Sequence, residues 1–137
     1  MTQTLKDVVL TRPVAASRPG PLDDRLYDLV ETHFRFQVER NPLIGTYLGI
    51  HTEDHRLGDA TRDGVLADLE ADRQHLAAVE AIDPAGLSSD ARFERDLELH
   101  NTRRAIFDTE EIRTWERRST ALDVVGDSLF LLFAQDF

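Results

Sequence analysis

Residues 51–60, with the sequence HTEDHRLGDA, form the one ligand-like cluster of this amino-acid sequence. His51, Asp54 and His55 supply two imidazoles and a carboxylate, a ligand set that suits zinc or another divalent ion. Three such ligands would leave one coordination position open for a catalytic water. The stretch is also polar and rich in turn residues. The same side chains therefore fit a solvated turn in which Asp54 or Asp59 accepts hydrogen bonds from nearby groups.

The other histidines give weaker indications of chemistry. His33 and His100 fall on apolar faces of predicted helices, where a lone histidine is more often a core residue with a hydrogen-bond partner than a ligand. His75 is predicted to face solvent. Acidic and arginine side chains alternate between Arg92 and Arg113, which is typical of a salt-bridged exposed face. We therefore assign no catalytic residue from the sequence.

Composition narrows the possible functions. The chain has 137 residues, a formal net charge of -10 and 41% hydrophobic residues, values typical of one acidic globular domain. It contains no cysteine, which excludes disulfides, thiolate metal sites and a cysteine nucleophile. The acidic balance disfavours nucleic-acid and anionic-membrane partners. No apolar run approaches the roughly 20 residues that a membrane span needs.

The start of the chain favours a cytoplasmic location. Residues 1–21 show no helical stripe and end in a cluster of proline and glycine. They also lack the basic start, long apolar stretch and cleavage site of a secretory signal. We expect a flexible tail here, followed by a helical domain over residues 22–137.

Apolar spacing predicts an all-α fold of antiparallel helical hairpins. Four helices are expected, over residues 22–40, 42–49, 61–83 and 88–112, each with a suitable capping residue, proline or glycine at its limits. A short connection between the last two predicts an antiparallel hairpin. The stripes expected to face the core are Leu26, Leu29, Val30, His33, Phe34 and Val38; Val65, Leu66, Leu69, Leu76, Val79 and Ile82; and Phe93, Leu97, His100, Ala105, Ile106 and Phe107.

The segment Leu129–Phe133 is the most apolar run of the chain. A helix of about ten residues from Gly126 is expected, with a buried strand as the alternative, and either needs burial on every side. The segment is either tucked into the chain's own core or belongs to a truncated piece whose covering surface is missing. Candidate interface residues are Trp115, Leu129, Phe130, Leu132 and Phe133.

Three stretches taken together carry a family resemblance. The first contains Asn41-Pro42, Thr46-Tyr47-Leu48-Gly49, His51, Asp54, Arg56-Leu57 and Asp59; the second Leu76, Ile82-Asp83-Pro84, Leu87-Ser88, Asp90 and Asp96-Leu97; the third Gly126 to Phe133 with Asp136-Phe137. In order and spacing they resemble the N-terminal region of the bacterial domain-of-unknown-function 885 family. Its members are longer helical proteins that look like zinc metallopeptidases of the gluzincin type.

The resemblance implies an incomplete piece of a larger helical fold. The family's H-E-x-x-H zinc helix lies far downstream, so this chain carries no zinc ligand, no general base and no cofactor of its own. His51, Asp54, Arg56 and Asp59 match a family motif, which we expect to be a loop that braces the catalytic cavity. The implied partner is the remainder of a longer chain. The alternative is a free-standing interaction module, a homo-oligomer that self-associates through the apolar C-terminal segment.

Overall fold

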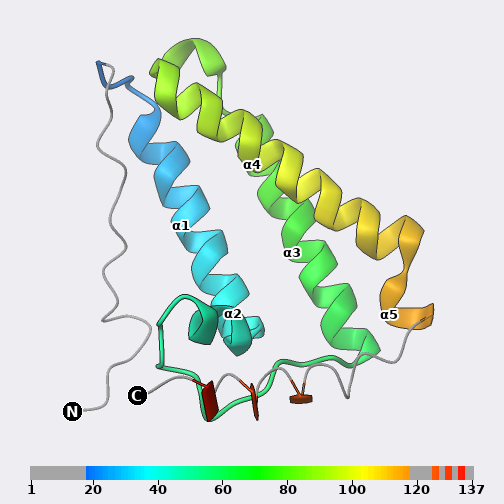
Figure 1. Ribbon diagram of the computed structural model, residues 1–137. Helices are drawn as coiled ribbons and strands as arrows, with labels where there is room; N and C mark the ends of the chain where they lie inside the picture. The colour runs from blue at the N-terminus through cyan, green and yellow to red at the C-terminus, as the bar shows by residue number, and fades with distance from the viewer. Residues whose placement is uncertain (1–17, 118–124, 127–128, 131–132, 135–137) are drawn as a thin grey trace.

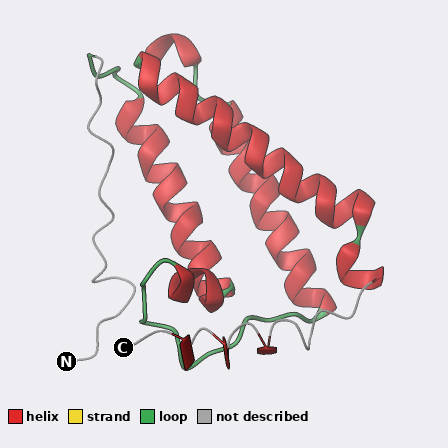
Figure 2. Ribbon diagram, viewed as in Figure 1, coloured by secondary structure: helices red, strands yellow, loops and turns green. Residues whose placement is uncertain are grey.

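The computed structural model describes residues 18–117 and three short pieces of the C-terminal segment, residues 125–126, 129–130 and 133–134 (Figure 1). The helices are α1 (Asp23–Arg40), α2 (Pro42–Tyr47), α3 (Arg62–Glu80), α4 (Ser89–Phe107) and α5 (Thr114–Arg117). In these parts of the chain there is no strand, so the predicted all-α fold is confirmed (Figure 2). None of the described helices is long and apolar enough to cross a membrane.

Local capping chemistry determines where the long helices begin. The Oγ1 atom of Thr61 accepts a hydrogen bond from the Gly64 N–H at 3.2 Å and caps α3. Ser88 does the same for α4, because its Oγ accepts from the Ala91 N–H at 3.2 Å. Gly49, just beyond α2, has a φ of 76°, a conformation that glycine adopts without strain. These limits lie within a few residues of those predicted from the sequence.

The predicted fourth helix differs near its end. The α-helical hydrogen bonding of α4 gives way to a π-helical turn, Asp108–Ile112, which closes with a bond of 2.9 Å from the Arg113 N–H to the Asp108 carbonyl. Arg113 then takes a left-handed φ of 54° and turns the chain into α5. The indole N–H of Trp115 donates to the Thr109 carbonyl at 3.0 Å. The ring thereby fastens α5 back onto this turn.

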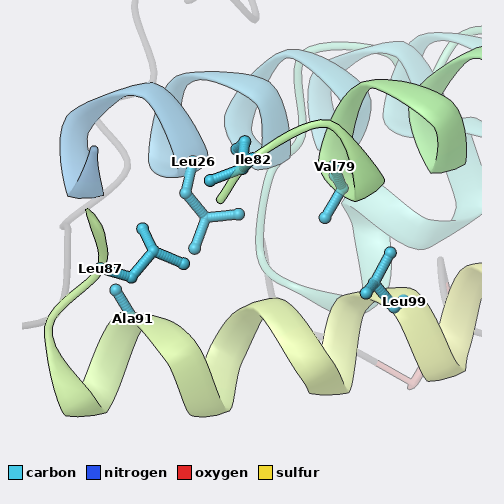
Figure 3. Close-up of a cluster of buried hydrophobic side chains, with 6 residues drawn as sticks. All are labelled: Leu26, Val79, Ile82, Leu87, Ala91 and Leu99. Atoms are coloured by element: carbon cyan, nitrogen blue, oxygen red, sulfur yellow. The ribbon is translucent and has the colours of Figure 1, made fainter. Parts of the chain in front are cut away.

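The three long helices α1, α3 and α4 pack against one another. Helices α3 and α4 form the predicted hairpin, joined by a short 3₁₀ turn, and α1 contacts both (Figure 1). The apolar core lies where the start of α1, the end of α3 and the start of α4 converge (Figure 3). Its buried members are Leu26, Val79, Ile82, Leu87, Ala91 and Leu99. The core is small, and polar contacts join the helices beyond it.

Helix α4 turns its apolar stripe outward. Phe93 is 70% exposed, and Leu97, His100 and Phe107 are exposed as well. The prediction that these residues face the core was wrong. The buried positions of α4 are Ala91, Leu99 and Thr102. The same face of α4 carries Glu98 and Arg95, which bind groups on α3. This mostly polar face packs inward, because its small side chains also allow the helices to approach closely. Leu66 of α3, also predicted to lie inside, is exposed.

The described pieces of the C-terminal segment are helical and exposed. Leu129, Phe130 and Phe133 all remain open to solvent, so these residues are not tucked into the chain's own core, which was one of the two expected alternatives. Leu129 lines a hollow together with Leu57 and is still 48% exposed. Leu132 and residues 1–17 of the predicted tail lie outside the described residues.

A buried carboxylate joins the start of α1 to the start of α4. Asp23 Oδ1 accepts from the Ser88 N–H at 2.9 Å, and its Oδ2 accepts from the Gly20 N–H at 2.9 Å. Nearby, the Leu22 N–H donates to the Gly86 carbonyl at 3.1 Å. Residue 20 must be glycine here, because a Cβ would lie 2.6 Å from the Gly86 oxygen. Burial disfavours the charged form of Asp23, but the bonds from Ser88 and Gly20 outweigh it and lower the pKa of the carboxyl.

We expect Asp23→Ala to lower the free energy of unfolding by about 1–3 kcal/mol at neutral pH, because two N–H groups lose their acceptor. A carboxyl whose pKa is lowered by folding stabilises the fold above its unfolded pKa of about 3.9. That contribution is lost as the pH falls through the folded pKa. The difference between wild type and variant should therefore shrink in acid, which urea unfolding at a series of pH values measures. Asp63→Ala, which removes an exposed carboxylate from the first turn of α3, offers a control, and an equal cost for both changes would contradict the assignment.

Candidate functional site

The loop between α2 and α3 contains the residues of the family-like motif. His51 Nδ1 lies 2.9 Å from Asp54 Oδ2. The other carboxylate oxygen of Asp54 accepts a 2.6 Å bond from the hydroxyl of Thr46, a buried residue of α2. Asp54 therefore links the exposed His51 to the interior of α2. The loop is anchored at this end by one carboxylate with two partners.

The second half of the loop is anchored to α3. Asp59 Oδ1 accepts from both the N–H and the hydroxyl of Thr61, at 3.0 and 2.6 Å, and so supports the residue that caps α3. These hydrogen bonds, with a smaller effect of Arg40, lower the pKa of the Asp59 carboxyl. Arg56 pairs with Glu53 at 2.8 Å instead of with either aspartate. The four motif residues thus act in three separate local contacts.

The three metal candidates do not converge. His55 is exposed, and the pair formed by His51 and Asp54 gains no third ligand from it. Within the described residues, no three His, Asp or Glu side chains stand where they could hold a metal ion together. The geometry instead matches the interpretation of a hydrogen-bonded turn. Beside the loop lies a hollow of about 130 Å³, lined in part by Thr46, Asp54 and Leu57.

A second polar cluster lies inside the helix packing, and the sequence pattern did not predict it. The imidazoles of His33 on α1 and His75 on α3 stack face to face, with ring centroids 3.9 Å apart and planes 4° apart. The two residues are 8% and 7% exposed. Nε2 of His75 lies 2.7 Å from Glu98 Oε1 on α4, and in this hydrogen bond the imidazole N–H donates to the carboxylate oxygen. The stack therefore links all three long helices.

The His33 side of the stack is also polar. Nε2 of His33 lies 3.3 Å from Asp72 Oδ1 on α3 and 3.0 Å from Gln37 Nε2 on α1. Gln37 and Asp72 also line a depression of about 220 Å³ between α1, α2 and α3. Arg40, at the same depression, binds Asp68 at 2.7 Å. A chain of polar contacts thus continues from the stack to the end of α1.

Paired imidazoles and carboxylates are the groups of acid–base catalysis, but their placement here favours a structural role. A general base must reach the proton that it removes, and both rings are more than nine-tenths buried. The accessible edge of the cluster consists of Asp72 and Gln37, which line the depression. The arrangement can align three helices through directional contacts, which an apolar cluster of the same size would do less specifically.

The sequence-based interpretations of the histidines had mixed outcomes. His33 is a buried residue with hydrogen-bonding partners, as expected. The prediction for His75 was wrong, because α1 and α4 cover the ring that was expected in solvent. His100 is exposed, contrary to its assignment to a core face. In α3, Asp72, His75 and Val79 share one helical face, and this spacing could have indicated that His75 is buried with Val79. The pattern is missed when only apolar residues are considered.

Searches against protein families, curated proteins and solved structures find no match to this chain. The resemblance to the domain-of-unknown-function 885 family therefore stays a prediction from the sequence. Only some of the candidate interface residues are exposed to a partner. Trp115 is half-buried and engaged by the turn after α4, whereas Leu129, Phe130 and Phe133 are exposed.

Replacing one ring of the stack should destabilise the fold strongly. His75→Ala removes the stacking surface of His33 and the donor to Glu98, and it opens a cavity between three helices. We expect a loss of about 2–4 kcal/mol in the free energy of unfolding, measured by urea titration. His55→Ala is the matched control, an exposed histidine that should change stability by less than about 0.5 kcal/mol. Equal losses for the two variants would rule out a structural role of the stack.

The motif loop should loosen when its anchor is removed. In Asp54→Ala, the Thr46 hydroxyl and His51 lose their shared acceptor, so we expect trypsin to cleave after Arg56 faster while the melting temperature of the helices changes little. His55→Ala, a change at an exposed neighbour, should leave the cleavage rate at its wild-type value. Unchanged cleavage in the Asp54 variant would show that the loop is held by other contacts.

Proposed function

We propose that this chain is the N-terminal helical segment of a protein that resembles zinc-dependent peptidases, and that it acts as a scaffold without catalysing the reaction itself. The observation that carries the proposal is an exposed apolar surface at the α2 end of the molecule. Tyr47, Leu48 and Leu57 are exposed there, Leu57 by 62%. We name this set, together with the exposed Phe130 and Phe133, the apolar end.

The elements of the apolar end lie close together. Leu57 lines one hollow with Val125 and Leu129, which places the motif loop next to the described C-terminal pieces. In Figure 1 these pieces lie below α2, at the level of the loop that follows it. Large apolar side chains gathered on one surface mark a place where another structure packs. Further helices, as the resemblance implies, would cover this surface and remove it from water.

The anchored motif loop supports the same proposal. Asp54 and Asp59 fix the loop between α2 and α3 through short hydrogen bonds, and Leu57 projects from it. A loop held at both ends can present a defined surface to a neighbouring domain. This is the role of a brace beside a catalytic cavity, and the zinc ligands and general base would come from the downstream part. In this proposal the protein is cytoplasmic.

A second candidate function is self-association of a free-standing module through the C-terminal segment. It is favoured by Phe133, which is 86% exposed, and by its exposed neighbours Leu129 and Phe130. Trp115 contributes less than expected, because its indole is bound to the Thr109 carbonyl. Phe130→Asp separates the two candidates. It should abolish a dimer of the second kind in light scattering, whereas the association state of the scaffold should not depend on Phe130.

We expect the double variant Tyr47→Asp/Leu57→Asp to bind less of a hydrophobic fluorescent dye than the wild-type chain. Its melting temperature should stay within about 2 °C, because both side chains are already largely in water. Leu66→Asp, an exposed leucine on α3, is the control and should leave dye binding nearly unchanged. Equal dye binding by the double variant and the wild-type chain would show that the apolar end is not the accessible surface.

The enzymatic part of the proposal needs a separate test. Extending the reading frame of the gene should reveal an H-E-x-x-H helix, and the longer protein should bind zinc and cleave peptides. Cleavage should stop when zinc is removed by a chelator and return when it is restored. A longer protein that neither binds zinc nor cleaves peptides would refute the peptidase assignment. The scaffold surface is tested separately, by the dye-binding experiment.

A further inference from the structure

Helix α4 presents an apolar stripe on its outer face, although its inner face already packs on α3 and α1. Phe93, Leu97, His100 and Phe107 follow one another at steps of four, three and seven residues, so they lie on one side of the helix. All four are exposed. Such a stripe is the usual mark of a helix face that packs against a partner. In the described part of the chain the three apolar side chains of the stripe keep between 48% and 70% of their surface exposed.

We propose that the outer face of α4 binds the same face of a second copy of this chain, as an antiparallel pair with its two-fold axis at His100. The face comprises Phe93, Asp96, Leu97, His100, Arg103 and Phe107. In an antiparallel pair centred there, facing residues have numbers that add up to about 200. Phe93 of one copy then meets Phe107 of the other, and this aromatic contact occurs twice.

The charged residues of the face fit the same register. Asp96 of one copy and Arg103 of the other lie on the same side of the line along which the two α4 helices meet. Two opposite-charge contacts therefore flank the two-fold axis. Both side chains extend into solvent, at 68% and 58% exposure, although Asp96 also lies 3.4 Å from Arg95 of its own chain. Arg103 already binds Glu80 of its own chain, and its guanidinium has further donors for a second carboxylate. Leu97 lies against the aliphatic stem of Arg104 from the second copy.

This charge pattern selects both the partner and its direction. A parallel pair would instead bring Arg103 of one copy beside Arg104 of the other, which repel each other, and would leave Asp96 beside Leu97. Only the antiparallel register pairs aromatic with aromatic and acid with base along the whole stripe. A second copy supplies that complementary pattern automatically. The proposal does not rest on the proposed function, because the apolar end is formed by α2, the motif loop and the C-terminal segment.

Sedimentation of the purified chain over a wide concentration range tests the association. We expect a reversible monomer–dimer equilibrium, weakened at least about tenfold by Phe93→Glu, which places a charge in the aromatic contact with Phe107 of the other copy. Leu66→Glu, on α3, is the matched control and should leave the equilibrium unchanged. A chain that stays monomeric at every concentration, or a dimer indifferent to Phe93→Glu, overturns the proposal.

Cross-linking tests the register, and the cysteine-free chain makes it clean. His100→Cys places a thiol at the axis, so mild oxidation should yield a disulfide-linked dimer. Ala77→Cys, on an exposed position of α3, should not cross-link. Spin labels at position 107 should lie roughly 21 Å apart along the helix direction in the antiparallel pair and adjacent in a parallel one. Association through the apolar end would cross-link positions 100 and 77 equally, and that result would overturn the proposal. Spin labels found adjacent at position 107 would overturn it as well.

Discussion

The stacked rings of His33 and His75 hold the long helices together beyond the point where the apolar core ends. Through Glu98 the stack also reaches α4, so one polar cluster touches every long helix. An apolar contact tolerates sliding and rotation, but two parallel rings with directional partners do not. The register of α1 against α3 follows from this. It sets Leu26 beside the end of α3 and Arg40 beside Asp68 near its start.

A fold held in this way has unusual surfaces. Since polar contacts and small side chains provide much of the internal packing, several large apolar side chains are left outside. They gather in two places, the outer face of α4 and the apolar end. Both the scaffold role and the pairing of two copies arise from the same cause, which is a core too small to bury all the apolar residues of the chain.

Local features of the fold could be predicted from the sequence, whereas the directions in which helices face could not. Helix limits depend on short-range chemistry, and the caps at Thr61 and Ser88 form as expected. The faces depend on partners far away in the chain. The sequence analysis assigned apolar residues at helical spacing to the core, because it assumed an apolar interior. It therefore placed Phe93 inside and His75 in solvent, the reverse of the structure. For the motif loop, the sequence indicated a hydrogen-bonded turn as one of two interpretations, but the partners of Asp54 needed the structure.

The bond between Asp23 and Ser88 joins residues 65 positions apart, and this has a consequence for the order of folding. Helices α3 and α4 are joined by a short turn, so they can meet after closing only a small loop. α1 has no such local route to α4. We therefore expect the hairpin of α3 and α4 to form early and α1 to dock later, when Ser88 is in place at the start of α4. The same asymmetry makes α1 the element that detaches first when the native protein opens transiently.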